Sequence, residues 1–265
     1  MKQLTDFVQE HLGEDTSKLL LKRNRWPEID MNLAVSCIES RNKLRNKVQE
    51  WYANPELIFP IALSAEQCSS TATGIYKSRF ADKIVTNGVI ADLTGGLGVD
   101  TWFFSKKASK VCYHEMQEAL CVAAKHNFNA LQADNITIRN IMTSVETIDD
   151  IMSAAKPDLV YMDPARRSES GKKVFLLEDC TPDALKLIEP IFRHCRHILL
   201  KLSPMADITM LHTRLGKECR EIHIVAYKGD CKEILIWMDR EWNQECTLKA
   251  IELPSDYPAV EPEAF

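Results

Sequence analysis

Residues 87–101 read NGVIADLTGGLGVDT, a short apolar strand followed by a glycine-rich turn and the first residues of a helix. Glycine permits positive φ values and lets the backbone come close to a ligand at a helix N-terminus. The dinucleotide fingerprint G-x-G-x-x-G would begin at Gly96 and require a glycine where Thr101 stands. The turn therefore predicts a site for a nucleoside cofactor that is not a dinucleotide.

The chain around this turn alternates between strands and helices. Apolar runs predict strands at 87–93, 110–115, 136–141, 158–163 and 197–202, and residues 221–227 and 233–238 predict a β-hairpin around 228–232. Four helices are expected between these strands. One starts at about Val99 and another ends at about Leu131. A third starts with Thr181 as N-cap and Pro182 at its first helical position, and the fourth runs from after Pro204 to about Gly216. Because parallel strands need crossover helices, this order predicts the α/β class. We expect a Rossmann-like, doubly wound, mostly parallel sheet of seven strands with a C-terminal antiparallel hairpin strand.

Composition divides the chain into three parts. Residues 1–82 show helical periodicity and are expected to form a small α-helical domain, which precedes the α/β domain at residues 83–241. Residues 242–265 contain three prolines and several acids, which is typical of a linker. We expect this tail to lead into a C-terminal domain that lies beyond the 265 residues.

Composition also excludes several classes of protein. Hydrophobic residues make up 45% of the chain, yet no stretch approaches the ~20 apolar residues of a membrane span, and the N-terminus carries no signal-type stretch. The nine cysteines are odd in number and form no C-x-x-C pair, so they predict reduced thiols and no zinc site. We therefore expect a soluble cytoplasmic protein that holds no metal and does not enter a membrane.

The net charge of −5 does not indicate a nucleic-acid-binding protein as a whole. Basic residues nevertheless gather in the N-terminal part, at Lys18, Lys22, Arg23 and Arg25 and again at Arg41, Lys43, Arg45 and Lys47. Two interpretations of these clusters stay open, namely solvated helix faces and a patch that binds a polyanion.

Carboxylates end the first two predicted strands, at the sheet edge where this architecture binds ligands. Asp92 would repel a pyrophosphate and suits a cationic ligand, while Glu115 can accept hydrogen bonds from two ribose hydroxyls. S-adenosyl-L-methionine combines an ammonium, a sulfonium and a ribose, so we expect it as the cofactor. Met116 is expected to pack on its adenine, with Asn140 and Ile141 along the adenine edge. The expected cofactor-binding residues are Asp92, Thr94, Gly95, Gly96, Gly98, Asp100, Glu115, Met116, Asn140, Ile141 and Asp163.

These residues resemble the motifs of a known family. The patterns Asp92-x-Thr94-x-Gly96-x-Gly98, Glu115 and Asp163-Pro164-Ala165-Arg166 are similar to motifs I, II and IV of class I S-adenosylmethionine-dependent methyltransferases, over about residues 83–240. This chain departs from the common pattern at Thr94, where many members have glycine, and near Met142, where an acidic residue is frequent. The resemblance implies the fold expected above and methyl transfer as the activity.

Four segments carry a narrower resemblance, to bacterial methyltransferases with a THUMP-like domain. They are EQCSSTATGIYKSRFA (66–81), DLTGGLGVDT (92–101), DPARR (163–167) and LLKLSP (199–204). THUMP domains bind RNA, so this resemblance implies RNA as the partner and a tRNA or rRNA base as the substrate. Those proteins continue into a substrate-binding region, so we expect this chain alone to bind RNA weakly. The alternatives are a small-molecule or protein methyltransferase and a catalytically silent protein that binds cofactor or RNA.

Asp163 and Pro164 follow the fourth predicted strand, where base-amino methyltransferases place D/N-P-P-Y. A carboxylate at that position accepts a hydrogen bond from the target amine and orients its lone pair. Ala165 and Arg166 stand in the last two positions, so the aromatic ring that stacks on a flipped base is missing. Catalytic roles are expected at Asp163, Pro164 and Arg166.

Substrate contacts are expected at Arg166, Arg167 and Ser203. The two arginines suit a clamp for phosphate or carboxylate, and a surface salt-bridge pair is an equal alternative. Lys201, on an apolar strand, is placed to pair with a carboxylate such as Asp163. The DPAR motif also resembles RNA methyltransferases that make 5-methyluridine, but these need a nucleophilic cysteine where this chain has Ser203 and Pro204, so that mechanism is disfavoured.

Overall fold

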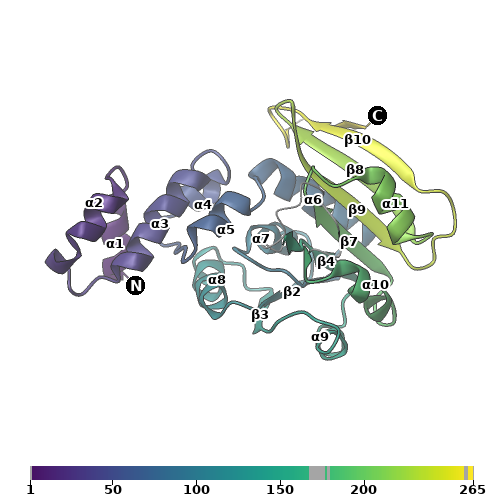
Figure 1. The fold of residues 1–265 in the computed structure, drawn as a ribbon, viewed down its shortest axis with the longest axis horizontal. Helices are drawn as coiled ribbons and strands as arrows, with labels where there is room; N and C mark the ends of the chain where they lie inside the picture. The colour runs from purple at the N-terminus through teal and green to yellow at the C-terminus, as the bar shows by residue number, and fades with distance from the viewer. Residues whose placement is uncertain (1, 167–176, 178–179, 260–261, 265) are drawn as a thin grey trace.

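The computed structural model describes residues 2–166, 177, 180–259 and 262–264, and its N-terminal part is helical (Figure 1). The elements that precede the sheet are α1 (Lys2–Glu10), α2 (Thr16–Leu21), the 3-10 helix η1 (Arg23–Arg25), α3 (Met31–Leu44), α4 (Gln49–Ala53), α5 (Ala62–Gln67) and α6 (Thr71–Ile84). This agrees with the helical periodicity of the first 82 residues.

Polar caps set the start of three of these helices. The carboxylates of Asp15 and Asp30 accept hydrogen bonds from first-turn N–H groups of α2 and α3. At α6, Ser70 and Thr73 form a reciprocal capping box. Because caps satisfy N–H groups that have no partner within the helix, the local sequence decides where these helices begin.

One large sheet organises the rest of the chain. Its strands are β1 (Val89–Asp92), β2 (Lys110–Glu115), β3 (Ile136–Asn140), β4 (Leu159–Met162), β7 (His197–Leu202), β8 (Cys219–Tyr227), β9 (Asp230–Asp239), β10 (Thr247–Leu253) and β11 (Glu263–Ala264). The helices between them are α7 (Val99–Ser105), α8 (Glu118–Ala130), α9 (Ile148–Ala155), α10 (Ala184–Phe192) and α11 (Ile208–Leu215). Two short strands, β5 (Ala165–Arg166) and β6 (Cys180–Thr181), pair separately.

The sheet is mostly parallel, as the alternation of strands and helices predicts. Within the described residues it has nine strands in the order β11-β10-β8-β9-β7-β4-β1-β2-β3, so the expected number of seven is wrong. β9 runs antiparallel to both β7 and β8. Lys228 and Gly229 join β8 to β9 with φ values of 58° and 76°, which confirms the predicted hairpin turn.

The two additional strands come from the tail that was expected to be a linker. β10 pairs in parallel with β8 along its whole length, and β11 pairs with β10. Ile251 and Leu253 are buried against the sheet, whereas their neighbours Ala250 and Glu252 are exposed. The expectation of a linker is therefore wrong for residues 247–253. Because β10 buries only two of its seven residues, the prolines and acids around it dominate the composition.

The start of α10 also differs from the prediction. Thr181 was expected to be the N-cap, but it lies in β6, and the Asp183 side chain caps the helix by accepting a hydrogen bond from Lys186 N–H at 3.4 Å. Thr and Asp are both good N-cap residues, so residue type alone does not favour Thr181 over Asp183. The pairing of β6 with β5 decides between them.

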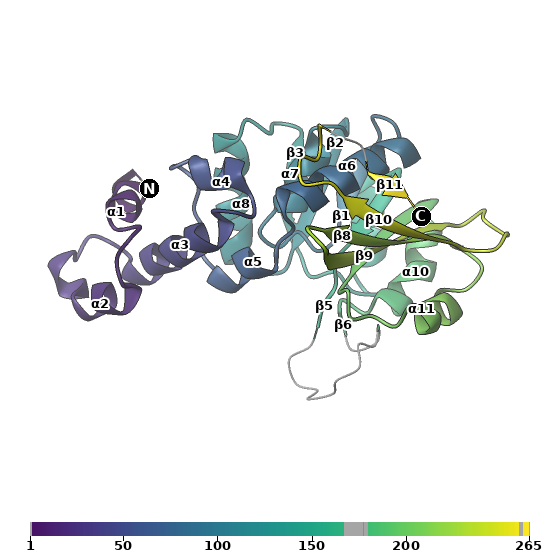
Figure 2. The same cartoon turned by 90° about the horizontal axis from the view of Figure 1, so that it is seen from above.

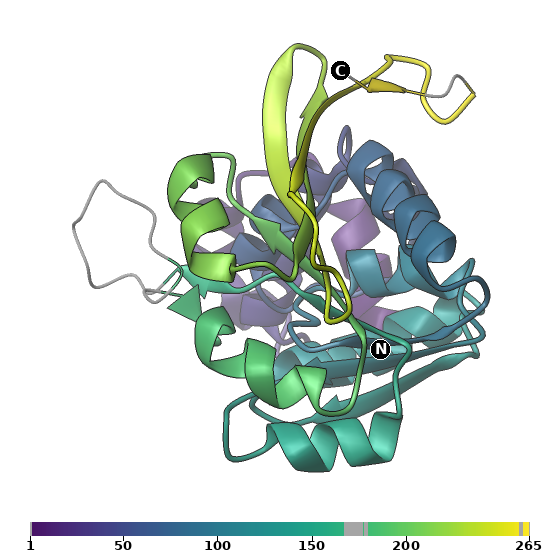
Figure 3. The ribbon, with the colours of Figure 1, turned by 90° about the vertical axis from the view of Figure 1, so that its right-hand side faces the viewer.

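Helices cover both faces of the sheet and produce three layers (Figure 3). One face packs on α9, α10 and α11 through a hydrophobic cluster that includes Ile151, Leu187 and Leu211. The opposite face packs on α6 and α7 through a cluster that includes Ala72 and Phe104. This arrangement leaves the carboxyl ends of β1, β2, β4 and β7 at one edge, which is where such sheets bind ligands.

The first helices extend away from the sheet to one side (Figure 2). Their core is continuous with the α/β part, because Trp51 of α4 lies in the same hydrophobic cluster as Trp102 of α7 and Phe128 of α8. Arg41, in the second basic cluster, is fully buried and donates hydrogen bonds to four backbone carbonyls between residues 52 and 57. Arg41 therefore holds the connection from α4 to α5 and does not belong to a surface patch.

Candidate active site

The Asp92 carboxylate holds the glycine-rich turn together. Its Oδ1 accepts a hydrogen bond from Thr94 N–H at 3.0 Å, and its Oδ2 accepts one from the Thr101 hydroxyl at 2.6 Å. The residue is only 1% exposed, and burial raises its pKa to about 7. Both carboxylate oxygens thus serve the turn itself, and a contact of Asp92 with a cationic ligand stays a prediction.

Thr94 connects the turn to the end of β4. Its hydroxyl oxygen accepts a hydrogen bond from Asp163 N–H at 2.6 Å. The departure from glycine at this position thus has a structural reason, since the threonine fixes the spacing between the ends of β1 and β4.

The glycines let the turn lie directly on β2. A Cβ at Gly95 would come within 2.1 Å of the Tyr113 ring, and a Cβ at Gly98 would come within 2.7 Å of Phe128. Gly96 has a φ of 54°, and its carbonyl accepts a hydrogen bond from Tyr113 OH at 2.7 Å. The side chains of Tyr113 and Phe128 consequently support the backbone of this turn. Neither residue was among the predicted site residues.

Glu115 lies beside the turn at the end of β2. Its Oε2 accepts a hydrogen bond from Gly96 N–H at 2.9 Å, and its Oε1 accepts one from Gln117 N–H at 2.8 Å. Each carboxylate oxygen can accept more than one hydrogen bond, so the group retains acceptor capacity for ligand hydroxyls. The structure thus brings Glu115 and the glycine turn together, as the sequence predicts.

Two large apolar side chains project at the ends of β2 and β3. Met116 is 54% exposed and Met142 is 52% exposed. Asn140 fixes the neighbouring backbone by donating to the carbonyls of Glu115 and Met116 at 2.8 and 3.0 Å. Asn140 therefore shapes this edge of the site through its amide nitrogen, and the Ile141 N–H reinforces it with a bond to Glu115 O.

Asp163 pairs with Lys201 at the carboxyl ends of β4 and β7. The Lys201 ammonium donates to Asp163 Oδ2, which confirms the pairing considered from the sequence. The Asp163 side chain is 33% exposed and the Lys201 side chain 13% exposed, so the pair borders open space. Burial opposes the charge on Lys201, but Asp163 and two further carboxylates raise its pKa above the usual lysine value.

The other predicted transfer-site residues are only partly described. Pro164 is buried, and the backbone of Arg166 pairs with Cys180 in the β5–β6 ribbon. Arg167 lies outside the described residues. Ser203 directly follows β7, and its hydroxyl accepts a hydrogen bond from Met205 N–H at 3.3 Å. Their roles with a substrate stay predictions.

Asp100, whose expected contact with the cofactor stays a prediction, belongs to a buried ion-pair network. Its Oδ2 accepts hydrogen bonds from Ser69 at 2.8 Å and Tyr161 at 2.7 Å, while its Oδ1 lies 3.3 Å from Lys77 Nζ. Lys77 Nζ also contacts both carboxylate oxygens of Glu233 at 2.8 and 2.7 Å. The network ties α6, α7, β4 and β9 together behind the Asp163–Lys201 pair.

Burial and charge act against each other in this network. Burial opposes ionisation of Asp100, but Lys77 and Lys201 hold the pKa of its carboxyl below the usual value. For Glu233, burial dominates and raises the pKa, although both lysines oppose this. Together with Asp163, three carboxylates therefore lie near two lysines in this part of the structure.

Sequence reasoning missed Lys77, Ser69, Tyr161 and Glu233. The sequence contains one indication that Lys77 is buried. Lys77 is four residues from both Thr73 and Ala81, which places it on the buried face of a helix. A lysine on such a face needs a buried partner. The sequence did not reveal that the partner would be Glu233, which lies 156 residues away.

No helix in the described part of the chain is both long and apolar enough to span a membrane. Across the same residues, no group of three or more His, Cys, Asp or Glu side chains is arranged to hold a metal ion.

Comparisons with known proteins identify the fold. No protein-family model and no curated protein sequence matches this chain. The crystal structure of a proposed methyltransferase from Porphyromonas gingivalis W83 matches with a TM-score of 0.81 and 32% identity, over 99% of this chain and 64% of that one. The chain thus spans slightly less than two thirds of the length of that protein, and it has a Rossmann-like methyltransferase fold.

Two weaker matches cover less of this chain. An rRNA methylase from Streptococcus thermophilus has a TM-score of 0.45 and 15% identity, over 63% of this chain and 96% of that one. A proposed methyltransferase from Streptococcus mutans, in complex with SAH, has a TM-score of 0.44 and 15% identity, over 62% of this chain and 95% of that one.

Proposed function

We propose that this protein is an S-adenosyl-L-methionine-dependent methyltransferase that modifies a base of tRNA or rRNA. The observation that carries the proposal is the placement of Glu115 and Asp163 on either side of the glycine turn, at the ends of β2 and β4, which both flank β1. The fold shared with the Porphyromonas gingivalis protein supports the same activity.

The residues at this edge fit the cofactor. Glu115 would accept hydrogen bonds from the ribose hydroxyls, and the exposed side chains of Met116 and Met142 would contact the adenine. The backbone at Gly96, where a Cβ would meet nothing nearer than Thr94 O at 3.7 Å, leaves room for the rest of the molecule. When bound, S-adenosyl-L-methionine supplies a methyl group on a sulfonium that a nucleophile can attack.

Asp163 would orient the acceptor. Its partly exposed carboxylate is placed to accept a hydrogen bond from a base amine and aim the nitrogen lone pair. Lys201 holds the carboxylate, and Thr94 holds the Asp163 backbone through its N–H. Lys201 remains protonated because its pKa is raised, so it acts as a fixed cation and not as a base. Catalysis would then come from positioning, which suits transfer to a neutral amine.

The activity is tested by offering labelled S-adenosyl-L-methionine and the protein to total RNA, to protein and to small-molecule fractions. We expect the label in RNA. Label confined to protein or to small molecules would contradict the RNA assignment but keep the methyltransferase, whereas no transfer together with no binding of S-adenosylhomocysteine would contradict the proposed function itself.

Replacing Glu115 with alanine is expected to weaken the binding of S-adenosylhomocysteine by about 1–3 kcal/mol, the effect of leaving charged hydrogen bonds unmade. Isothermal titration measures this effect, and the native protein should not bind NAD. Glu118→Ala, an exposed acid in the first turn of α8, is the matched control and should keep native affinity. Equal affinity of the Glu115→Ala variant and the native protein would contradict the ribose contact.

Arg166 and Arg167 follow the Asp163-Pro164 pair in sequence and are proposed to contact the phosphates of the substrate. Changing both to alanine should weaken RNA binding and lower the slope of log affinity against log salt by about one for each phosphate that is no longer neutralised. Arg193→Ala, at the exposed end of α10, should leave the slope unchanged. An unaltered slope in the double variant would favour the salt-bridge interpretation of these arginines.

A further inference from the structure

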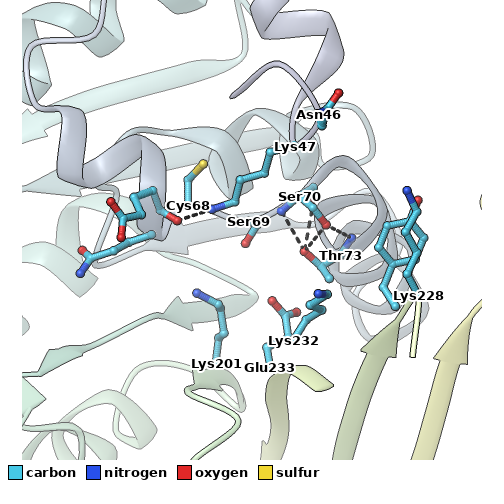
Figure 4. A pocket seen from close by; sticks show the side chains of 13 residues that line it. Asn46, Lys47, Cys68, Ser69, Ser70, Thr73, Lys201, Lys228, Lys232 and Glu233 are labelled. Atoms are coloured by element: carbon cyan, nitrogen blue, oxygen red, sulfur yellow. Dashed lines mark hydrogen bonds between the residues drawn. The ribbon is translucent and has the colours of Figure 1, made fainter. Parts of the chain in front are cut away.

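A cavity of about 490 Å³ lies next to the Asp163–Lys201 pair (Figure 4). Segments far apart in the sequence form its walls: residues 46–47 after α3, residues 66–70 and Thr73 around the start of α6, Lys201 at the end of β7, and residues 227–228 and 232–233 of the β8–β9 hairpin. Its size lies within the range of pockets that hold small ligands, which runs from about 300 to 1,000 Å³. The first helices therefore supply one wall of a space that the α/β part alone would leave open.

Four of the lining side chains are lysines, namely Lys47, Lys201, Lys228 and Lys232. The two carboxylates in the lining are already paired with other lysines. Glu66 lies 2.8 Å from Lys43, and Glu233 is held by Lys77. Lys201 and Lys232 are in turn paired with Asp163 and Asp230, so the positive charge that the lining adds comes mainly from Lys47 and Lys228.

Lys47 contributes one of these charges. In Figure 4 its ammonium points into the cavity from the side opposite Lys201, and it donates to the backbone carbonyls of Ala65 and Glu66. Burial lowers the pKa of Lys47, and the charge of Lys201 acts in the same direction. An anion beside Lys47 would compensate its charge, whereas Lys201 is already paired with Asp163.

The remaining lining groups suit a nucleotide. Hydroxyl and amide groups are supplied by Asn46, Gln67, Ser69, Ser70 and Thr73, and the half-buried ring of Tyr227 supplies an aromatic surface. Lysines bind phosphates, and aromatic rings stack on bases. Tyr227 also offers, from the hairpin, the kind of ring that the DPAR motif lacks.

We propose that this cavity binds a phosphate-bearing nucleotide of the RNA substrate, with Lys47, Lys228 and Lys232 contacting the phosphates. The inference rests on the proposed function, because Lys201 joins the cavity to the Asp163 carboxylate that would orient the acceptor base. It assigns the first helices and the β8–β9 hairpin a shared role, as opposite walls of the acceptor site.

The test uses the full chain and a short fluorescent single-stranded RNA of mixed sequence, with S-adenosylhomocysteine at saturation so that RNA cannot occupy the cofactor site. Lys228→Glu/Lys232→Glu should weaken RNA binding about tenfold or more at low salt. Lys125→Glu/Lys217→Glu changes the same amount of charge at exposed positions outside the cavity and should stay within about threefold of the native protein. An uncharged morpholino oligomer of the same sequence should not distinguish the cavity variant from the native protein.

Unchanged affinity for S-adenosylhomocysteine in each variant shows that the protein is folded. Failure of the native protein to bind S-adenosylhomocysteine would overturn the proposed function. Normal binding of S-adenosylhomocysteine with equal reductions of RNA affinity in both double variants would overturn the cavity assignment alone. Transfer of label only to protein would also overturn the cavity assignment, because the methyl acceptor would then not be a nucleotide.

Discussion

Replacing Asp163 with alanine is expected to lower the rate of methyl transfer by at least about a hundredfold, the usual effect of removing a group that stabilises or orients the reacting atoms. The carboxylate lies at the end of β4, one-third exposed, and is held by Lys201, while the backbone N–H of Asp163 donates to the hydroxyl of Thr94. Without it, a target amine has no acceptor that directs its lone pair. Single-turnover kinetics with bound RNA measure the chemical step apart from RNA binding.

Two controls separate positioning from folding in that experiment. Asp163→Asn keeps an oxygen acceptor in the same place and should retain more activity than Asp163→Ala. The affinity for S-adenosylhomocysteine should stay near native in Asp163→Ala, since the ribose contact is made by Glu115. If the alanine variant transfers methyl groups within a few-fold of the native rate, another group orients the acceptor.

Replacing Lys77 with methionine is expected to lower the free energy of unfolding by about 3–5 kcal/mol, because it leaves buried carboxylates without their cation. The Lys77 side chain is fully buried, and it contacts Glu233 at 2.7 Å and Asp100 at 3.3 Å. Chemical denaturation measures this destabilisation. Lys217→Met, at an exposed position, should change the stability by less than about 0.5 kcal/mol.

The pH dependence of this destabilisation has a definite sign. Burial raises the pKa of Glu233 in the folded state, so the folded protein binds a proton there more readily than the unfolded chain does. Stability from such a group is present at low pH and is lost as the pH rises through the raised pKa. Removing Lys77 raises that pKa further, so the destabilisation should be smaller at acidic pH and grow towards neutral and alkaline pH.

A double variant tests whether the effect belongs to the ion pair. Lys77→Met combined with Glu233→Gln removes both charges and should recover part of the stability, which gives a coupling energy in a double-mutant cycle. A destabilisation below about 1 kcal/mol for Lys77→Met, with no pH dependence, would show that the network is not an important source of stability.

Local patterns determined much of the fold. The alternation of apolar strands with helices from residue 87 to residue 202 predicted the parallel sheet. The hydrophobic periodicity that distinguishes a strand from a helix depends only on residues close together in the sequence. The same applies to the hairpin at Lys228 and Gly229 and to the placement of Glu115 beside the glycine turn, since strand ends and turns are local features that parallel topology brings to one edge.

Only the tertiary structure decided how the polar groups are used. Asp92 and Asp100 stand where a cofactor contact was expected, yet their carboxylates bind Thr101 and Lys77. Residues 247–253 have the composition of a linker, yet they complete the sheet because β8 offers an unpaired edge. A side chain's partner depends on which distant segment packs against it, and the free energy of burying a charge depends on that partner. The sequence by itself therefore determined which strands meet at the site, whereas the packing of α6 and the hairpin across it decided which carboxylates remain available for a ligand.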